Sequence, residues 1–200
     1  MENGVKHDEL LVKNVNIGRV ENIIINGIDI AEVYGGSSHG GKNGRWKAFD
    51  GKQNKATPIV AGYKLPDAEA VEGGLDFKLP NGQHTGYIKN IVFNDVHVLV
   101  KGGNPASDKD NIPPELGVGQ YNVANLGVQP SYGLWVRHVK DLTVSGSSFK
   151  YEQADGRYAI SLDDVQGAEI SDVKLNVDNE YKNLLGLKNA VNVQLDRKNL

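Results

Sequence analysis

Apolar residues recur along the C-terminal half of the chain in a fixed pattern. Within each copy they stand at offsets 0, 2, 5, 8 and 10, and three copies follow one another at intervals of 26 and 25 residues. The copies are Leu134, Val136, Val139, Leu142 and Val144; Ile160, Leu162, Val165, Ala168 and Ile170; and Leu185, Leu187, Ala190, Val193 and Leu195. Near the N-terminus the same template finds Val15, Ile17, Val20, Ile23 and Ile25, with a partial copy at Ile88, Ile91 and Phe93. Such a near-constant period identifies an internal repeat.

The spacing inside each copy predicts short strands joined by bends. A step of two between apolar residues is typical of a strand with one inward face, and the steps of three mark changes of direction. No window has the length and period of a convincing helix. Because strand-only repeats of about 25 residues are typical of solenoids, we predict an all-β fold, namely a parallel β-helix.

Two polar positions of the repeat predict its corners. Asn22, Asn90, Asp141, Gly167 and Asn192 stand immediately before the fourth apolar residue, and Asn26, Asn94, Ser145, Ser171 and Asp196 stand just past the fifth. Several of these residue types tolerate a left-handed backbone or bond to local amides. Equivalent side chains of adjacent coils should stack at about 4.8 Å, so we expect polar ladders along the turns.

The repeat is interrupted twice. Residues 31–83 break the template, and residues 101–131 carry Pro105, Pro113, Pro114 and Pro130, which excludes them from a sheet interior. Long insertions of this kind are often functional. We expect residues 1–200 to form one partial β-helix domain, with both insertions near each other on one side.

Composition excludes several classes of partner. The net charge is only −3, so nothing in the electrostatics implies a nucleic-acid partner. The chain has no cysteine, which excludes disulfides and thiolate metal sites. It has no apolar run of about 18 residues, so we expect no membrane partner. Residues 1–9 are polar and do not resemble a signal peptide.

Three strings follow one another in a familiar order: ENIIINGIDI, YIKNIVFNDVHVLV and SYGLWVRHVKDLTVSGSSFKYEQADGRYAISLDDVQGAEISDVKL. Over roughly residues 10–180 this succession resembles the C-terminal coils of glycoside hydrolase family 28, the polygalacturonases and rhamnogalacturonan hydrolases. The resemblance implies a right-handed, pectin lyase-like β-helix that acts on an acidic, pectin-like polysaccharide. It also implies a secreted or periplasmic full-length protein and no cofactor.

The catalytic strings of that family do not carry over. Members resemble one another in Asn-Thr-Asp, Asp-Asp, Gly-His-Gly and Arg-Ile-Lys strings, in that order. Here the Asp163-Asp164 pair follows its strand instead of leading into it, His39 lacks the preceding glycine, and Arg-Ile-Lys is absent. Since the family's strings precede the coils matched here, we expect a C-terminal part of a larger enzyme, inactive alone, with its catalytic residues unknown.

The carboxylates of this chain lead to the same expectation. An inverting glycosidase needs an acid and a base about 6.5–9.5 Å apart, whereas Asp163 and Asp164 are sequence neighbours that we expect at a corner. Arg137, Asp163 and Lys188 share one template position in three coils, which predicts a column of alternating charge. If exposed, such a pair contributes at most about 1 kcal/mol, so we interpret it as setting the register.

Two groups of residues are candidates for sugar binding. Trp135 points outward between Leu134 and Val136, and its equivalents Asn16, Ser161 and Gly186 are small, so its ring could stack on a pyranose face. The alternative is that Trp135 packs beneath the 101–131 insertion. The second group, His39, Arg45, Trp46 and Lys47 with Lys42, suits a uronate carboxylate. Its alternative is a solvated loop anchored by Trp46.

Metal binding is not predicted, because the histidines are scattered and His97 alternates with valines as a surface strand residue. A polysaccharide lyase of the same fold would use Ca²⁺ and a basic residue, for which Asp108, Lys109 and Asp110 offer a weak hint. A non-catalytic carbohydrate-binding or adhesion β-helix is the third class.

The first coil has no predicted cap. A solenoid with an open end exposes apolar surface and unpaired strand edges, and Leu10, Leu11 and Val12 lie close to Met1. We therefore expect end-to-end self-association of the isolated chain.

Overall fold

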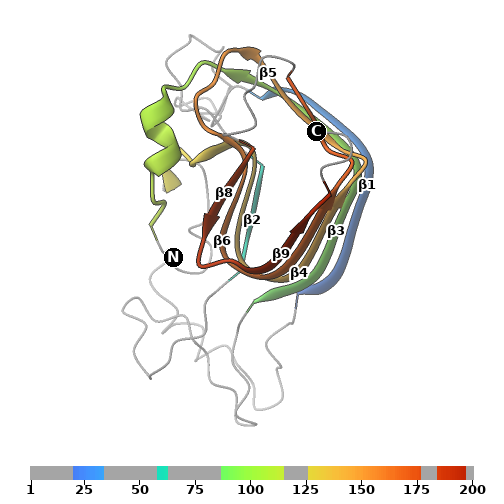
Figure 1. Cartoon of the computed structure of the whole chain (residues 1–200). Helices are drawn as coiled ribbons and strands as arrows, with labels where there is room; N and C mark the ends of the chain where they lie inside the picture. The colour runs from blue at the N-terminus through green and yellow to red at the C-terminus, as the bar shows by residue number, and fades with distance from the viewer. Residues whose placement is uncertain (1–19, 34–57, 63–86, 115–125, 177–183, 197–200) are drawn as a thin grey trace, which may run out of the picture.

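The computed structural model describes residues 20–33, 58–62, 87–114, 126–176 and 184–196, and it is an all-β structure (Figure 1). In these ranges all strand pairs are parallel and join into one curled sheet. The strands are β1 (Glu21–Val33), β2 (Ile59–Ala61), β3 (Ile88–Gly102), β4 (Ser131–Ser145), β5 (Ser148–Gln153), β6 (Tyr158–Ser171), β7 (Lys174–Leu175), β8 (Leu185–Lys188) and β9 (Val191–Leu195). A short 3₁₀ helix, η1 (Ala106–Asp110), lies between β3 and β4.

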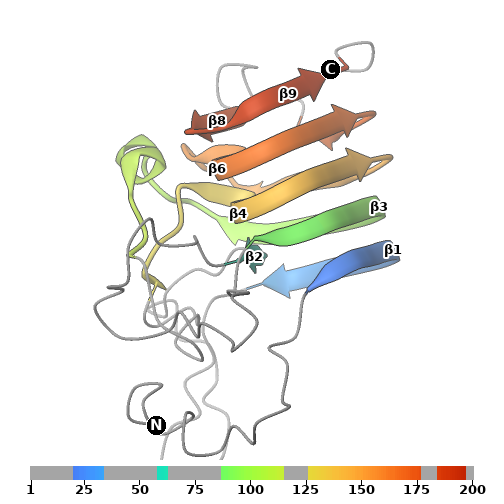
Figure 2. The same cartoon turned by 90° about the horizontal axis from the view of Figure 1, so that it is seen from below.

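The strands stack in five layers along the chain (Figure 2). The first layer is β1, the second β2 with β3, the third β4 with β5, the fourth β6 with β7, and the fifth β8 with β9. This division follows from the pairing, because β2 and β3 both pair with β4, and β8 and β9 both pair with β6. None of the helices within the described ranges is long and apolar enough to cross a bilayer.

The register confirms the repeat read from the sequence. Leu134 pairs with Ile160, and Ile160 with Leu185, so the first apolar positions of three copies lie one above another. The fourth positions, Leu142, Ala168 and Val193, do the same. These side chains face the interior of the curl, and those of the third and fourth layers are almost wholly buried. The alternating pattern therefore fixes both the inward face and the alignment of the layers.

The predicted corner residues adopt the left-handed backbone. Asn22, Asn90, Asp141, Gly167 and Asn192 have φ between 54° and 83°. The two asparagines of the first two layers begin the predicted ladder, since Asn90 Nδ2 donates to Asn22 Oδ1 over 2.6 Å. In the second ladder Asn94 bridges two layers, donating to Asn26 Oδ1 (2.6 Å) and accepting from Ser145 Oγ (2.9 Å).

A further column of left-handed corners consists of His138, Asp164 and Asn189, with φ of 52°, 55° and 51°. Asp164 is thus a corner residue, as expected. His138 Nδ1 and Tyr87 OH both lie within hydrogen-bond distance of Asp164 Oδ2, at 2.8 Å and 2.6 Å. The sequence pattern assigned no corner to His138, although histidine, like Asn and Asp, is enriched among the non-glycine residues with positive φ.

The two interruptions of the repeat need correction in detail. Strand β1 extends to Val33, and β2 lies inside the 31–83 stretch, where the template predicted no strand. Its three residues pair with Trp135, Val136 and Arg137. The second interruption corresponds to residues 103–130 between β3 and β4, close to the expected 101–131.

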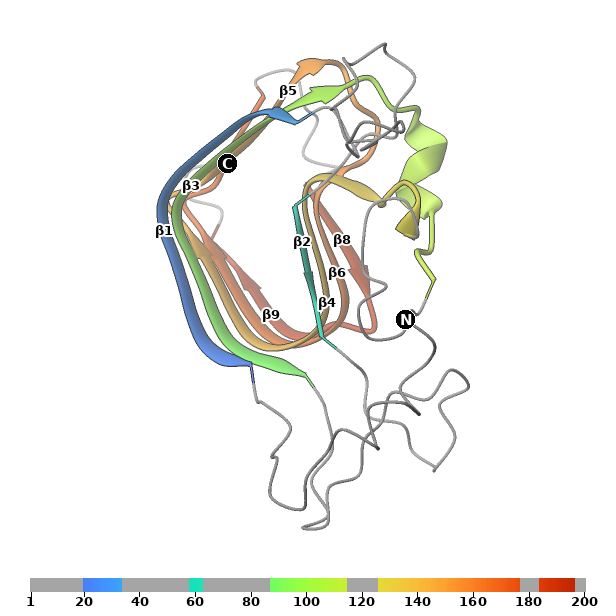
Figure 3. The ribbon, with the colours of Figure 1, turned by 180° about the vertical axis from the view of Figure 1, so that it is seen from behind.

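The curl has distinct walls, seen from behind in Figure 3. One wall, called here the β8 wall, consists of residues 59–61, 134–137, 160–163 and 185–188, which lie side by side. The opposite wall contains β3 and β9 with the second halves of β4 and β6. The outer surface of the β8 wall carries the candidate site.

Candidate functional site

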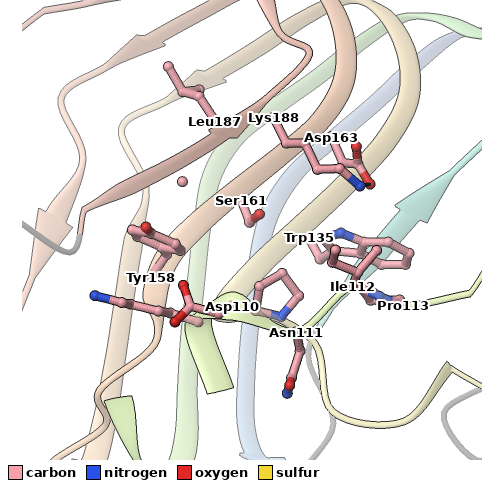
Figure 4. Close-up of a pocket in the computed structure, with 13 residues that line it drawn as sticks. Asp110, Asn111, Ile112, Pro113, Trp135, Tyr158, Ser161, Asp163, Leu187 and Lys188 are labelled. Atoms are coloured by element: carbon pink, nitrogen blue, oxygen red, sulfur yellow. Dashed lines mark hydrogen bonds and ion pairs between the residues drawn. The ribbon is translucent and has the colours of Figure 1, made fainter. Parts of the chain in front are cut away.

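A pocket of about 300 Å³ lies on the outer face of the β8 wall (Figure 4). Residues 109–113, called here the roof segment, form one side of it. The lining residues are Lys109, Asp110, Asn111, Ile112, Pro113, Pro130, Trp135, Tyr158, Ser161, Asp163, Gly186, Leu187 and Lys188. The pocket therefore combines strand residues of three layers with the second insertion.

Small residues of the wall make room for an aromatic ring. Trp135, Ser161 and Gly186 form one outward column. A Cβ atom added to Gly186 would lie 2.5 Å from Cδ2 of Tyr158, a separation that real Cβ atoms do not tolerate. The ring of Tyr158 thus lies over Gly186, so the space that the sequence analysis left open beside Trp135 is partly occupied.

Trp135 is fully buried, so the expectation of an exposed ring for stacking on a sugar is wrong. Figure 4 shows Ile112 and Pro113 of the roof segment beside the indole. On the wall, the guanidinium carbon of Arg137 lies 4.7 Å from the ring centroid, a cation–π contact. This arrangement agrees with the alternative in which Trp135 packs beneath the second insertion. The alternation of inward and outward residues predicted correctly that Trp135 lies on the outer face of its strand. It could not predict which residues cover the ring.

The indole nitrogen of Trp135 is buried and has no hydrogen-bond partner in the part of the chain that the structure describes. Figure 4 shows this nitrogen on the side of the ring that faces Ser161. A buried donor without a partner costs about 1–3 kcal/mol, so such groups are uncommon in folded proteins. The pocket therefore offers an unused N–H donor.

The column of alternating charge is present as predicted. Asp163 Oδ2 lies 2.6 Å from Arg137 Nη2 and 3.5 Å from Lys188 Nζ, and Arg137 Nε also donates to it over 2.8 Å. The expectation that the pair is exposed is wrong, because the side chains of Arg137 and Asp163 are only 1% and 11% exposed. Lys188 is 48% exposed. Asp163 is therefore held mainly by Arg137, and Lys188 faces the solvent.

The stretch from Asn104 to Pro114, which includes the roof segment, is fastened at both ends. Arg137 Nη1 donates to the carbonyl oxygen of Pro114 (3.2 Å). At the other end, the carbonyl oxygen of Asn104 accepts from the Gly156 amide (2.9 Å). A Cβ atom on Gly156 would lie 2.5 Å from Cα of Ala106, so only glycine permits this close approach.

A buried ion pair supports the Gly156 turn. Asp155 and Arg157 form a bidentate contact with N–O distances of 2.9 Å and 3.0 Å, and both side chains are fully buried. Arg157 also donates to the carbonyl oxygen of Ser131 (3.1 Å), and the Asn104 amide donates to Asp155 (3.3 Å). Asp-Gly-Arg signals a turn in the sequence, but these distant backbone partners left no signal there. The pair thus links the Gly156 turn to Asn104, which precedes η1, and to Ser131 at the start of β4.

The structure places the remaining candidates as follows. His39, Arg45, Trp46 and Lys47 lie outside the described residues. His97 is on the surface as expected, with its ring nitrogens 2.9 Å from Ser148 Oγ and 3.1 Å from Asp95 Oδ1.

Of the acidic residues of η1, Asp110 lines the pocket and Asp108 accepts from Asn104 Nδ2 (2.7 Å). Within the described ranges no three His, Asp or Glu side chains gather closely enough to hold a metal ion.

Comparison with known proteins gave no match to a family model, a curated protein or a solved structure. Functional inference therefore depends on the pocket itself and on the sequence strings quoted above.

Proposed function

We propose that the chain is a segment of a right-handed parallel β-helix that binds an acidic, pectin-like polysaccharide. In this proposal it is the C-terminal part of a glycoside hydrolase, and the catalytic acids lie on coils outside this chain. The stacked parallel layers and the left-handed corner columns support the fold. The resemblance of the sequence strings to glycoside hydrolase family 28 supports the class of protein.

The observation that carries the proposal is the chemistry of the pocket. Sugars need a concave site with an apolar surface and a few convergent polar groups. Here Tyr158 supplies apolar surface, while Ser161, Asn111 and Asp110 supply hydrogen-bonding groups. Lys109 and Lys188 on the rim supply positive charge for uronate carboxylates.

The same geometry favours binding over cleavage by the pocket. General acid catalysis needs a carboxyl group that can carry a proton to the glycosidic oxygen. Asp163 instead accepts charged hydrogen bonds from Arg137. That contact keeps its carboxylate paired, so we assign it to the framework of the site.

Affinity electrophoresis tests the proposal. We expect the purified chain to be retarded strongly in a gel that contains polygalacturonate and much less in a gel that contains neutral galactan. Lys109→Glu should reduce the retardation about tenfold. Lys150→Glu changes the net charge equally, but Lys150 is exposed on β5 and does not line the pocket, so it should bind like the unaltered chain.

Incubation with polygalacturonate tests the catalytic part. We expect neither new reducing ends nor product absorbing in the ultraviolet. Unsaturated product would instead identify a lyase, and saturated reducing ends would show that this chain carries its own acid and base. Absence of retardation on polygalacturonate would overturn the binding function.

A further inference from the structure

Two donors of the pocket have hydrogen-bonding capacity that their contacts with the described residues leave unused. The first is the indole N–H of Trp135, which is buried and has no partner among those residues. The ring of Trp135 contacts the Arg137 guanidinium and lies beside the roof segment (Figure 4). An acceptor on a ligand would recover the cost of its burial.

The second donor is the ammonium group of Lys188. Its contact with Asp163 is long, at 3.5 Å, and its side chain is about half exposed. Arg137 makes two shorter contacts with the same oxygen. Lys188 can therefore turn towards a ligand without leaving Asp163 unpaired, whereas Arg137 cannot.

The balance of charge in the pocket favours an anion. Among the described lining residues, Lys109 and Lys188 face Asp110 and Asp163, and Arg137 neutralises Asp163. Two positive charges therefore remain against the single negative charge of Asp110. The volume of about 300 Å³ is at the small end for ligand pockets, which suits one or two sugar rings.

We propose that Trp135 and Lys188 determine the specificity of this pocket, Trp135 as a hydrogen-bond donor to a sugar oxygen and Lys188 as the partner of the sugar's carboxylate. The inference rests on the proposed function and gives Trp135 a different role from ring stacking. A uronate ring is held by its polar edge, and Tyr158 provides the apolar contact. Neutral sugars use the indole N–H but not Lys188.

NMR titration of the ¹⁵N-labelled chain tests this assignment. The chain has two tryptophans, so Trp46→Phe assigns the indole signal of Trp135. We expect digalacturonate and neutral galactobiose both to move that signal downfield. Lys188→Gln should weaken digalacturonate binding about tenfold and leave galactobiose binding unchanged. Lys150→Gln, outside the pocket, should change neither affinity.

The outcomes separate this inference from the proposed function. If polygalacturonate retards the chain while the Trp135 indole signal stays in place, the binding function stands and the specificity assignment falls. The assignment is also overturned if Lys188→Gln lowers the affinities for digalacturonate and for galactobiose equally. If neither retardation nor a shift is seen in a chain whose spectrum shows it folded, both proposals fall.

Discussion

Leu162 and Leu187 occupy the same position of the repeat in adjacent layers and pair directly in the sheet. Leu162 is fully buried, whereas Leu187 in the fifth layer is 55% exposed. In the first layer Ile28 is likewise exposed, while its partner Val96 in the second layer is buried. The apolar pattern therefore gives each side chain its direction, but burial comes from the layers above and below, as expected for a stack of repeats.

The charged column differs between layers in the same way. Arg137 and Asp163 belong to the third and fourth layers and are buried, and Lys188 of the fifth layer is half exposed. One template position thus holds a buried ion pair in the middle of the stack and a solvated cation at its end. Identical sequence positions should then differ strongly in their contribution to stability.

The largest difference is expected within the charged column. Arg137→Met should lower the free energy of unfolding by about 3–5 kcal/mol, because it leaves a buried carboxylate without its main partner. Lys188→Met should cost less than about 1 kcal/mol, since an exposed charge pair contributes little. Urea titration of both variants measures the two values. Similar losses for both would show that the column is equally important in every layer.

A second difference is expected in the apolar core. Leu162→Ala creates a cavity between two layers and should cost about 2–5 kcal/mol. Leu187→Ala removes a side chain that is already about half in solvent and should cost about 1 kcal/mol or less. The shift of the urea midpoint at constant slope measures each change. An equal cost would mean that Leu187 is covered in solution, for example by a second chain stacked on the fifth layer.

The smallest difference is expected at the corners. Gly27 in the first layer and Gly167 in the fourth both have positive φ, so alanine at either should cost about 1–2 kcal/mol for the left-handed backbone. At Gly167 the added Cβ would also lie 3.0 Å from Asp141 Oδ1, whereas at Gly27 its nearest neighbour is Asp95 Oδ2 at 3.9 Å. Gly167→Ala should therefore be the more destabilising of the two in thermal unfolding. The reverse order would contradict this account of the corners.

The sequence predicted the corners and the alignment of the layers because both depend on local chemistry repeated in register. Asn22, Asn90 and Asn192 each need a left-handed backbone at the same step of the template, and they have it. The column of Arg137, Asp163 and Lys188 was predictable for the same reason. Whenever one position recurs, each copy tests the interpretation of the others.

Non-local features could not be predicted in this way. Strand β2 has three residues and no period of its own, and only its pairing with residues 135–137 makes it a strand. Trp135 is buried, and the residues beside its indole in Figure 4, Ile112 and Pro113, belong to an insertion outside the template. The Asp155–Arg157 pair depends on backbone groups of Asn104 and Ser131. The residues that the β8 wall contributes to the pocket were thus predictable, whereas the position of the roof segment was not.

The corner between β2 and β3 has a practical consequence. In the third layer Arg137, His138 and Val139 follow one another directly, and their partners in the second layer are Ala61 and Ile88 on either side of Gly62. Gly62 bonds to the carbonyl oxygen of Arg137, and its Cβ position lies 2.8 Å from the nitrogen of Ile88. Gly62 and Ile88 therefore lie together at one point of the scaffold. This corner is a grafting site, where a foreign loop or a small domain with adjacent ends can be inserted after Gly62 without changing the length of any strand.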